Sequence, residues 1–174
     1  SEYFIDANTA GDTFNGEAVR VTAGYIVTAE DSATAETVGV LQGIFYNAAT
    51  TLKPTFAHWY DGAITPANSE DVKAFVNDNP FQLYNCATDA AVASTIVGAH
   101  AKYLDTFGAA ANTGGSTSTG KSTNTLDIGT THATTQQWRL VRSAEDPENN
   151  DLTAAYCTVV VIQNLNQYID STGS

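Results

Sequence analysis

Apolar and polar residues alternate with a period of two in several short stretches of the chain, which is the pattern of half-buried β-strands. In residues 17–22, Val19 and Val21 fall on one face, and the next strand-like stretch is residues 25–28. The intervening Ala23-Gly24 is a turn signal, so this region predicts a β-hairpin.

Other stretches also read as strands, either through alternation or through their content of β-branched and aromatic residues. They are residues 1–6, 37–46, 55–60, 72–76, 81–84, 96–104, 136–142 and 155–162.

Three of these regions carry more specific expectations. Gly39 and Gly43 lie inside the longest early strand, where they predict a bulge or a tight bend of the kind found at a barrel corner. Residues 72–76 and 81–84 flank a polar turn, so we expect a second hairpin there. Residues 89–95 are compatible with a short helix that begins at Thr88 or Asp89 as its N-cap.

We find no internal repeat and no convincing long helix. The predicted fold class is therefore mainly β with little helix, a small β-barrel or β-sandwich built as one or two SH3-like or OB-like barrels. The 174 residues suit a single β-rich domain, with two subdomains at residues 1–70 and 71–174 as the alternative.

The charge balance limits the classes of partner. The formal net charge is −12, with seven Lys and Arg residues, and only 15% of the residues are charged. Nucleic acids and anionic membranes both require cationic surfaces, so neither is expected as a partner. No apolar run approaches the roughly 18 residues of a membrane span, and no signal-peptide pattern opens the sequence. No methionine is present, so we expect that an initiating segment was processed or is missing.

One stretch, Gly115-Ser-Thr-Ser-Thr-Gly-Lys-Ser122, matches the phosphate-loop pattern G-x-x-x-x-G-K-[ST]. A working phosphate loop needs a buried strand before it and a helix directly after it, so that backbone N–H groups converge on the phosphates. Residues 107–114 form a small-residue linker with no run of Val, Ile or Leu, and residues 123–131 are rich in Thr and Asn without helical periodicity. We therefore interpret the segment as a polar loop between strands, and expect Lys121 to make no phosphate contact.

Cys86 and Cys157 lie far apart in sequence, each in a strand-like apolar setting. Buried, reduced thiols are the favoured interpretation, with a disulfide as the alternative. A metal site would need further ligands with suitable spacing, and these are lacking.

We identify no catalytic, cofactor-binding or metal-ligating residues in the sequence. His58, His100 and His132 have no metal-ligand spacing, and His58 beside two aromatic residues favours a packed or partly exposed ring. No nucleophile-elbow or paired-acid motif occurs. The acidic cluster at residues 145–148 favours a solvated loop, with a calcium site as the minority alternative. The expectation is a protein that is not an enzyme and has no cofactor.

A series of features in the second half resembles a family of small structural proteins of tailed bacteriophages, described as capsid decoration, cement or minor head proteins. The most recognisable parts are the Ser/Thr-rich segment at residues 115–122 with Leu126-Asp127, and the closing stretch at residues 159–168. The other matching parts are Asp78-Asn-Pro-Phe81, Ile96-Val-Gly-Ala-His-Ala-Lys-Tyr103, Trp138-Arg-Leu-Val141 and Pro147-Glu-Asn-Asn-Asp151, with looser matches at Gly16-Glu-Ala-Val19 and Gly39-Val-Leu-Gln-Gly43. The chain departs from the family in its last strand, and it lacks the usual N-terminal arm.

The resemblance implies a non-enzymatic virion protein that binds the outer surface of an icosahedral head and stabilises it. Its partners would be the major capsid protein and copies of itself, as a dimer or trimer. The net charge supports an outer location, because packaged DNA would repel it, and the acidic loops 30–36 and 145–151 should face solvent or basic patches.

The alternative function is a head fibre or vertex spike that binds a receptor or glycan. Trp59, Tyr60 and Trp138 could then form a sugar platform, although core packing is the favoured interpretation of all three.

Overall fold

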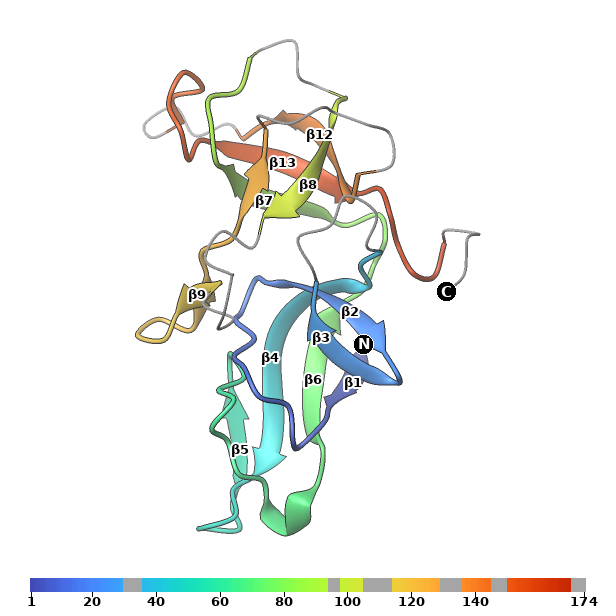
Figure 1. Cartoon of the computed structure of the whole chain (residues 1–174), viewed down its shortest axis with the longest axis vertical. Helices are drawn as coiled ribbons and strands as arrows, with labels where there is room; N and C mark the ends of the chain where they lie inside the picture. The colour runs from blue at the N-terminus through green and yellow to red at the C-terminus, as the bar shows by residue number, and fades with distance from the viewer. Residues whose placement is uncertain (30–35, 94–97, 105–113, 129–135, 145–149, 170–174) are drawn as a thin grey trace. The chain divides into compact units, whose positions relative to one another are not determined.

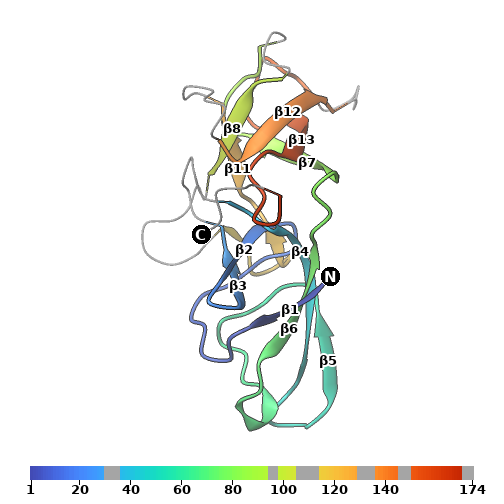
Figure 2. The same ribbon diagram turned by 90° about the vertical axis from the view of Figure 1, so that its right-hand side faces the viewer.

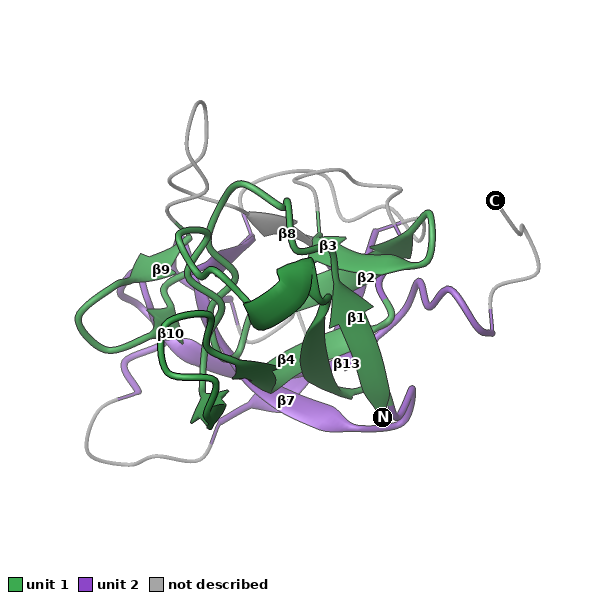
Figure 3. Cartoon of the chain, turned by 90° about the horizontal axis from the view of Figure 1, so that it is seen from below, with its two compact units in different colours: residues 1–29, 38–78, 107–123 green, residues 30–37, 79–106, 124–174 purple. Residues whose placement is uncertain are grey.

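The computed structural model describes residues 1–29, 36–93, 98–104, 114–128, 136–144 and 150–169 (Figure 1). Residues in strands make up 49% of the structure and residues in helix 2%, so the predicted mainly β fold is confirmed. The chain forms two compact units, coloured separately in Figure 3. The first comprises residues 1–29, 38–78 and 107–123, and the second comprises residues 30–37, 79–106 and 124–174. Both units are discontinuous in sequence, in contrast to the continuous halves 1–70 and 71–174 considered above.

The first unit is built on a six-stranded antiparallel sheet with the order β1-β6-β4-β2-β3, in which β5 also pairs with β4. The sheet is strongly curled, as Figure 2 shows. Its strands are β1 (Glu2–Ile5), β2 (Ala18–Thr22), β3 (Tyr25–Thr28), β4 (Gly39–Asn47), β5 (Pro54–Ala57) and β6 (Val72–Asn77), with a single 3-10 turn at Ala67–Ser69.

The predicted hairpin is confirmed as β2 and β3. Ala23 and Gly24 have φ angles of 51° and 90°, and both lie in the left-handed region. Two such residues form a type I′ turn, whose twist matches that of the flanking strands.

The predicted bend in the longest strand is also confirmed. The pairing of β4 with β6 shifts register between Leu41 and Gly43, which is the signature of a β-bulge. Gly39 is required for a different reason, since a Cβ there would collide with the backbone carbonyl of Asn77 on β6.

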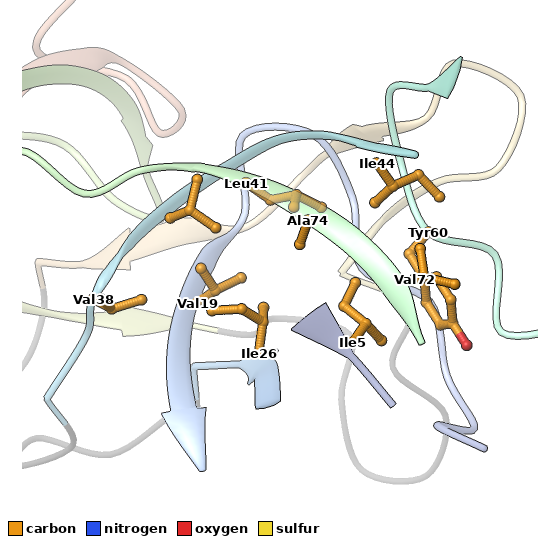
Figure 4. Close-up of a cluster of buried hydrophobic side chains, with 10 residues drawn as sticks. Ile5, Val19, Ile26, Val38, Leu41, Ile44, Tyr60, Val72 and Ala74 are labelled. Atoms are coloured by element: carbon orange, nitrogen blue, oxygen red, sulfur yellow. The ribbon is translucent and has the colours of Figure 1, made fainter. Parts of the chain in front are cut away.

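The concave side of this sheet holds the apolar core of the first unit (Figure 4). On β6, Val72, Ala74 and Val76 are buried and alternate with outward-facing residues. The remaining buried members of the core are Ile5, Val19, Ile26, Val38, Leu41, Ile44 and Tyr60.

The predicted hairpin between residues 72–76 and 81–84 is wrong. β6 pairs with β1 and β4, whereas the following strand β7 (Leu83–Thr88) pairs with strands of the second unit. The connection is not a two-residue hairpin turn, because the Asn79 side chain accepts the Phe81 N–H and its carbonyl accepts the Gln82 N–H. These local bonds turn the chain away from β6.

The second unit is a closed barrel with the strand order β11-β7-β13-β12-β8. All of its pairings are antiparallel except that of β7 with β11. The strands other than β7 are β8 (His100–Leu104), β11 (Thr125–Asp127), β12 (Trp138–Ser143) and β13 (Thr158–Gln163). The last two confirm the strands predicted near residues 136–142 and 155–162.

The short helix expected at residues 89–95 is absent from its described part, residues 89–93. The two residues predicted as candidate N-caps form hydrogen bonds within the second unit instead. The Thr88 hydroxyl donates to the carbonyl of Ala90, and the Asp89 carboxylate accepts the N–H of Ile128 at 2.9 Å. Residues 94–95 lie outside the described part.

Candidate functional site

The phosphate-loop-like segment forms a small hairpin of β9 (Gly115–Ser116) and β10 (Lys121–Ser122), and it belongs to the first unit. Both of its glycines face aromatic rings. A Cβ at Gly115 would collide with the ring of Phe14, and a Cβ at Gly120 would collide with Trp59 and His58. Phe14 and Trp59 stack on each other, with ring centroids 5.1 Å apart and planes 10° apart. The glycines are thus explained by close packing.

Backbone N–H groups in the second half of the segment are already used. Those of Thr119 and Gly120 donate to the carbonyl of Ser116, at 3.1 and 2.6 Å. That of Ser122 donates to the carbonyl of Asn15 at 2.9 Å, and the Asn15 N–H returns a bond of 2.9 Å to the carbonyl of Gly120. A phosphate cradle needs such groups free and convergent, and here they are paired with carbonyls.

The segment is followed by a strand, β11, and not by a helix. The expectation that no helix directly follows the segment is therefore confirmed, whereas the segment itself is a small hairpin and not simply a loop. Lys121 is exposed, and its failure to contact phosphate stays a prediction.

Of the three histidines, the structure describes the side-chain contacts of His58. Its Nε2 lies 2.9 Å from the carbonyl oxygen of Thr119. Because a carbonyl only accepts, Nε2 must carry the proton, and in the neutral ring Nδ1 is then an acceptor. His132 and the side chain of His100 lie outside the described part of the chain.

The three aromatic residues considered for a sugar platform do not form one. Tyr60 is fully buried, and its hydroxyl donates to the carbonyl of Thr9 at 3.1 Å. Trp138 is buried in the second unit, where its ring meets Tyr84 edge-on at 5.7 Å. Trp59 is half-buried and stacked on Phe14. Packing therefore explains these rings.

Both cysteines are free thiols, as the sequence predicted; Cys157 is buried as expected, whereas Cys86 is half-buried. Cys86 on β7 pairs with Val159 on the adjacent strand β13. Cys157 lies two residues before Val159, so the two cysteines are diagonal neighbours. Diagonal positions are about 7–8 Å apart, which is too far for a disulfide without backbone movement. Burial raises the pKa of the Cys86 thiol to about 12. The Cys157 sulfur lies 3.0 Å from the Thr88 hydroxyl.

The acidic loops fall mostly outside the described residues. In the described end of the second loop, Asp151 accepts bonds from the Thr153 hydroxyl at 2.6 Å and from its N–H at 2.9 Å, and these bonds lower the pKa of Asp151. Asn150 ties the loop to β13 by accepting the Thr158 N–H at 2.8 Å. Within the described ranges, no three His, Cys, Asp or Glu residues are grouped so that they could hold a metal ion.

A surface feature that the sequence analysis missed lies on the convex face of the first unit's sheet. Cross-strand pairing places four outward residues in one row, namely Phe4, Lys73, Phe45 and Phe56, on β1, β6, β4 and β5. Phe4 and Phe56 are exposed, at 44% and 73% of their surface. The Lys73 ammonium lies 2.6 Å from a Glu2 carboxylate oxygen, so its charge is neutralised locally.

The neighbouring row contains Glu2, Phe75 and Gly43, on β1, β6 and β4. At Gly43 the row has no side chain, and a hollow of about 380 Å³ opens there. Phe56 and Phe75 line it, with ring centroids 6.4 Å apart and planes 17° apart. Phe45 continues the aromatic surface, 4.7 Å from Phe56.

Two polar side chains complete the lining, those of Gln42 and His58. Gln42 is the exposed residue of the bulge, and its backbone carbonyl accepts the Asn15 amide at 2.6 Å. We call the region lined by Gln42, Gly43, Phe56, His58 and Phe75 the aromatic hollow.

A sequence signal for this hollow does exist. In residues 55–60, Phe56 and His58 alternate with the residues between them, and they therefore share a face. Aromatic content drew attention to Trp59 and Tyr60. Tyr60 has the same parity as Phe56 and His58 but is buried, because β5 ends at Ala57 and the alternation does not continue to residue 60. The bulge at Gly43 was predicted, but its effect on the outer surface depends on which strands flank it.

Among the described residues, no helix is long and apolar enough to cross a lipid bilayer. Comparisons with protein-family models, with curated proteins and with solved structures found no match.

Proposed function

We propose that this chain is a non-enzymatic virion structural protein that binds the outer surface of an icosahedral bacteriophage head and stabilises it. The observation that carries the proposal is that two sets of residues largely coincide: those that carry the resemblance and those that pack or pair in this fold. The residues through which the sequence resembles phage decoration and minor head proteins are largely residues that build this fold, which is what a resemblance based on a shared fold would produce.

The Ser/Thr-rich segment illustrates this. Its two glycines pack against Phe14, Trp59 and His58, and its backbone bonds join it to Asn15. Leu126, which follows it in the resemblance, is 1% exposed and lies on β11 of the barrel. These residues have structural roles, as expected for a protein that acts by fitting a partner's surface and not by catalysis.

The closing part of the resemblance also builds the barrel. Trp138 and Leu140 on β12 are buried, and residues 159–161 on β13 pair with β7 and β12. A protein that binds only the assembled head stabilises that state by mass action, without needing an active site.

The partners proposed are the major capsid protein and further copies of this chain, as a dimer or trimer. The net charge of −12 favours the outside of the head, because densely packed DNA phosphates would repel the chain inside. On the outside the same charge helps to keep particles apart in solution.

The decisive experiment is to locate the protein in intact particles by electron cryomicroscopy. Many regularly spaced copies with mutual contacts on the outer shell are expected. A few copies at vertices would favour the fibre or spike function, and isolated monomers would count against the proposed dimer or trimer.

Limited proteolysis of intact particles tests the location independently. We expect cleavage within residues 30–36 and 145–151 before the particles are opened. Cleavage that occurs only after disruption would place the protein inside and overturn this part of the proposal.

A further inference from the structure

We propose that the aromatic hollow on the convex face of the first unit's sheet is a binding site for an uncharged saccharide chain. The inference rests on the hollow itself and does not depend on attachment to a phage head. Its elements are an exposed aromatic wall, a floor without side chains, two neutral polar groups and the absence of net charge.

The aromatic wall supplies the apolar contact. Phe56, Phe75 and Phe45 form a continuous series of rings, with centroids 4.7 and 6.4 Å apart between neighbours. Phe56 is 73% exposed, although burying an aromatic ring is normally favourable. Clustered exposed rings of this kind mark interaction surfaces. The C–H faces of a sugar ring can cover such rings while its hydroxyl groups remain in contact with water.

The floor has no side chain at Gly43. Gly43 stands in the row where its neighbour Phe75 on β6 carries a side chain, and it forms part of the lining of the hollow. The glycine itself is buried, and a Cβ at this position would lie 3.1 Å from the carbonyl oxygen of Ala57, so the close approach of the backbone after β5 requires a glycine here. The volume of about 380 Å³ falls in the range of small-ligand sites and is larger than one apolar side chain requires.

The two polar groups match hydroxyl chemistry. His58 donates from Nε2 to Thr119, which leaves Nδ1 of the neutral ring as an acceptor for a hydroxyl proton. The Gln42 amide offers both donors and an acceptor, and the residue is exposed at the bulge. A purely apolar partner side chain would leave these groups without hydrogen bonds.

Charge decides among the possible occupants. No carboxylate or ammonium group lines the hollow, and the nearest charged row-neighbours, Lys73 and Glu2, neutralise each other at 2.6 Å. The chain as a whole carries −12, so acidic polysaccharides are disfavoured by repulsion. An uncharged saccharide does not meet this penalty.

The test uses the full-length chain, labelled with ¹⁵N, and uncharged hexasaccharides of glucose, mannose and N-acetylglucosamine as probes. Each is added to about 10 mM, ten times a Kd of about 1 mM, which is a reasonable bound for a shallow site. We expect at least one probe to give saturable amide shifts confined to residues near Gly43, Phe56 and Phe75. If none of the three gives saturable shifts there, the proposal is overturned.

Variants separate the site from its surroundings. Phe56→Ala and Phe75→Ala should each weaken binding at least about tenfold, since aromatic stacking contributes at this level. Phe4→Ala is the matched control, because Phe4 is an exposed ring on the same sheet face outside the hollow, and its affinity should be unchanged. Equal losses in all three variants would contradict a defined site.

Gln42→Leu distinguishes a saccharide from a protein partner. It removes the hydrogen-bonding group and adds apolar surface at an exposed position. Saccharide affinity should fall several-fold, whereas a contact with an apolar protein side chain should be kept or strengthened. The contrary result has three parts: phage heads bind the wild type and Gln42→Leu equally, they do not bind Phe56→Ala, and no hexasaccharide binds the chain. In that case the hollow is a protein contact, and the saccharide proposal fails.

Discussion

The two units end their β-sheets in different ways. The second unit closes its five strands into a barrel, so no strand edge is left open. The first unit keeps an open order from β1 to β3, with β5 as a further edge, and curls around its core instead. The aromatic hollow lies on the outer face of the open sheet, beside the edge strand β5. Closure therefore removes edges, whereas the open sheet keeps an edge strand next to the hollow.

The interiors differ as well. In the first unit the buried polar side chains among the described residues are those of Thr13 and Glu17, and the core is otherwise apolar. The described buried polar residues of the second unit are Thr37, Thr88, Asn124, Thr125, Asp127, Gln136, Gln137, Gln163 and Asn166. The Gln163 amide donates to the Thr37 hydroxyl at 3.1 Å and accepts from the Asn166 amide at 3.0 Å. The second unit therefore combines buried polar contacts with its own apolar core, whereas the interior of the first is mostly apolar.

The largest effect on the difference between the two units is expected from truncating a buried side chain in the core of one unit at a time. Leu41→Ala in the first unit and Leu140→Ala in the second should each cost about 2–5 kcal/mol, because both side chains are buried and leave cavities. Trp59 lies in the first unit and Trp138 in the second. Variants that retain only one of these tryptophans therefore allow the unfolding of each unit to be followed by fluorescence. We expect each truncation to lower the midpoint of its own unit more. Equal shifts of both probes would show a single cooperative body.

Gly120→Ala tests the packing of the hairpin in the first unit and should be the next largest effect. Its φ of 65° and the collision with Trp59 and His58 together predict a loss of roughly 2–4 kcal/mol. Gly24→Ala is the matched control, with a φ of 90° and open space around it, and should lose only about 1 kcal/mol. Urea denaturation measures both, and similar losses would mean that the close packing contributes nothing.

Gln163→Leu tests the polar interior of the second unit. The substitution leaves the Asn166 amide without this bond inside the protein, and a loss of about 1–3 kcal/mol is expected. Gln82→Leu, whose amide bonds an exposed carbonyl, should change stability by less than about 0.5 kcal/mol. A stable Gln163→Leu variant in the same urea assay would show that the bonds are dispensable.

Alkaline pH provides a smaller perturbation that acts on the second unit. The pKa of Cys86 rises from 9.0 to about 12 on folding, so the unfolded state loses its proton first. The contribution of Cys86 to stability is constant below pH 9 and falls as the pH rises from 9 towards 12. Relative to wild type, Cys86→Ala should show a shallower decline in urea midpoint across this window. An identical decline would contradict the assignment, as would rapid native-state labelling of Cys86 by a thiol reagent near pH 8.

The smallest expected effect is that of Phe56→Ala on folding. A ring that is 73% exposed contributes little to the core, and its contact with Phe45 adds less than about 1 kcal/mol. Thermal unfolding should therefore change little while saccharide binding is lost. A large destabilisation would mean that the exposed ring has a structural role.

Local patterns in the sequence were sufficient for much of the fold. The hairpin around Ala23-Gly24, the bulge near Gly43, and strands β12 and β13 follow from alternation, β-branching and glycine placement. These signals depend on neighbouring residues, so they can be found without knowing the partners.

Features set by distant partners were missed or wrong. The connection at residues 77–82 joins two units instead of two paired strands, because β6 finds its partners in β1 and β4. Thr88 and Asp89 cap no helix because their side chains bond residues brought close by the barrel. The hollow likewise depends on which rings the pairing of β4, β5 and β6 places beside Gly43. None of these pairings is encoded in a local pattern.

The discontinuity of the two units has a consequence for the order of events during synthesis. The hairpin at residues 115–122 completes the packing around Phe14 and Trp59, and Thr37 bonds the chain near Leu165 and Asn166. During translation the first unit therefore cannot acquire its full set of contacts when residue 78 leaves the ribosome, and the second must retain an early segment until its last strand arrives. Each unit is therefore expected to complete its folding only after its late segment has been synthesised, and neither unit can be excised as one continuous fragment.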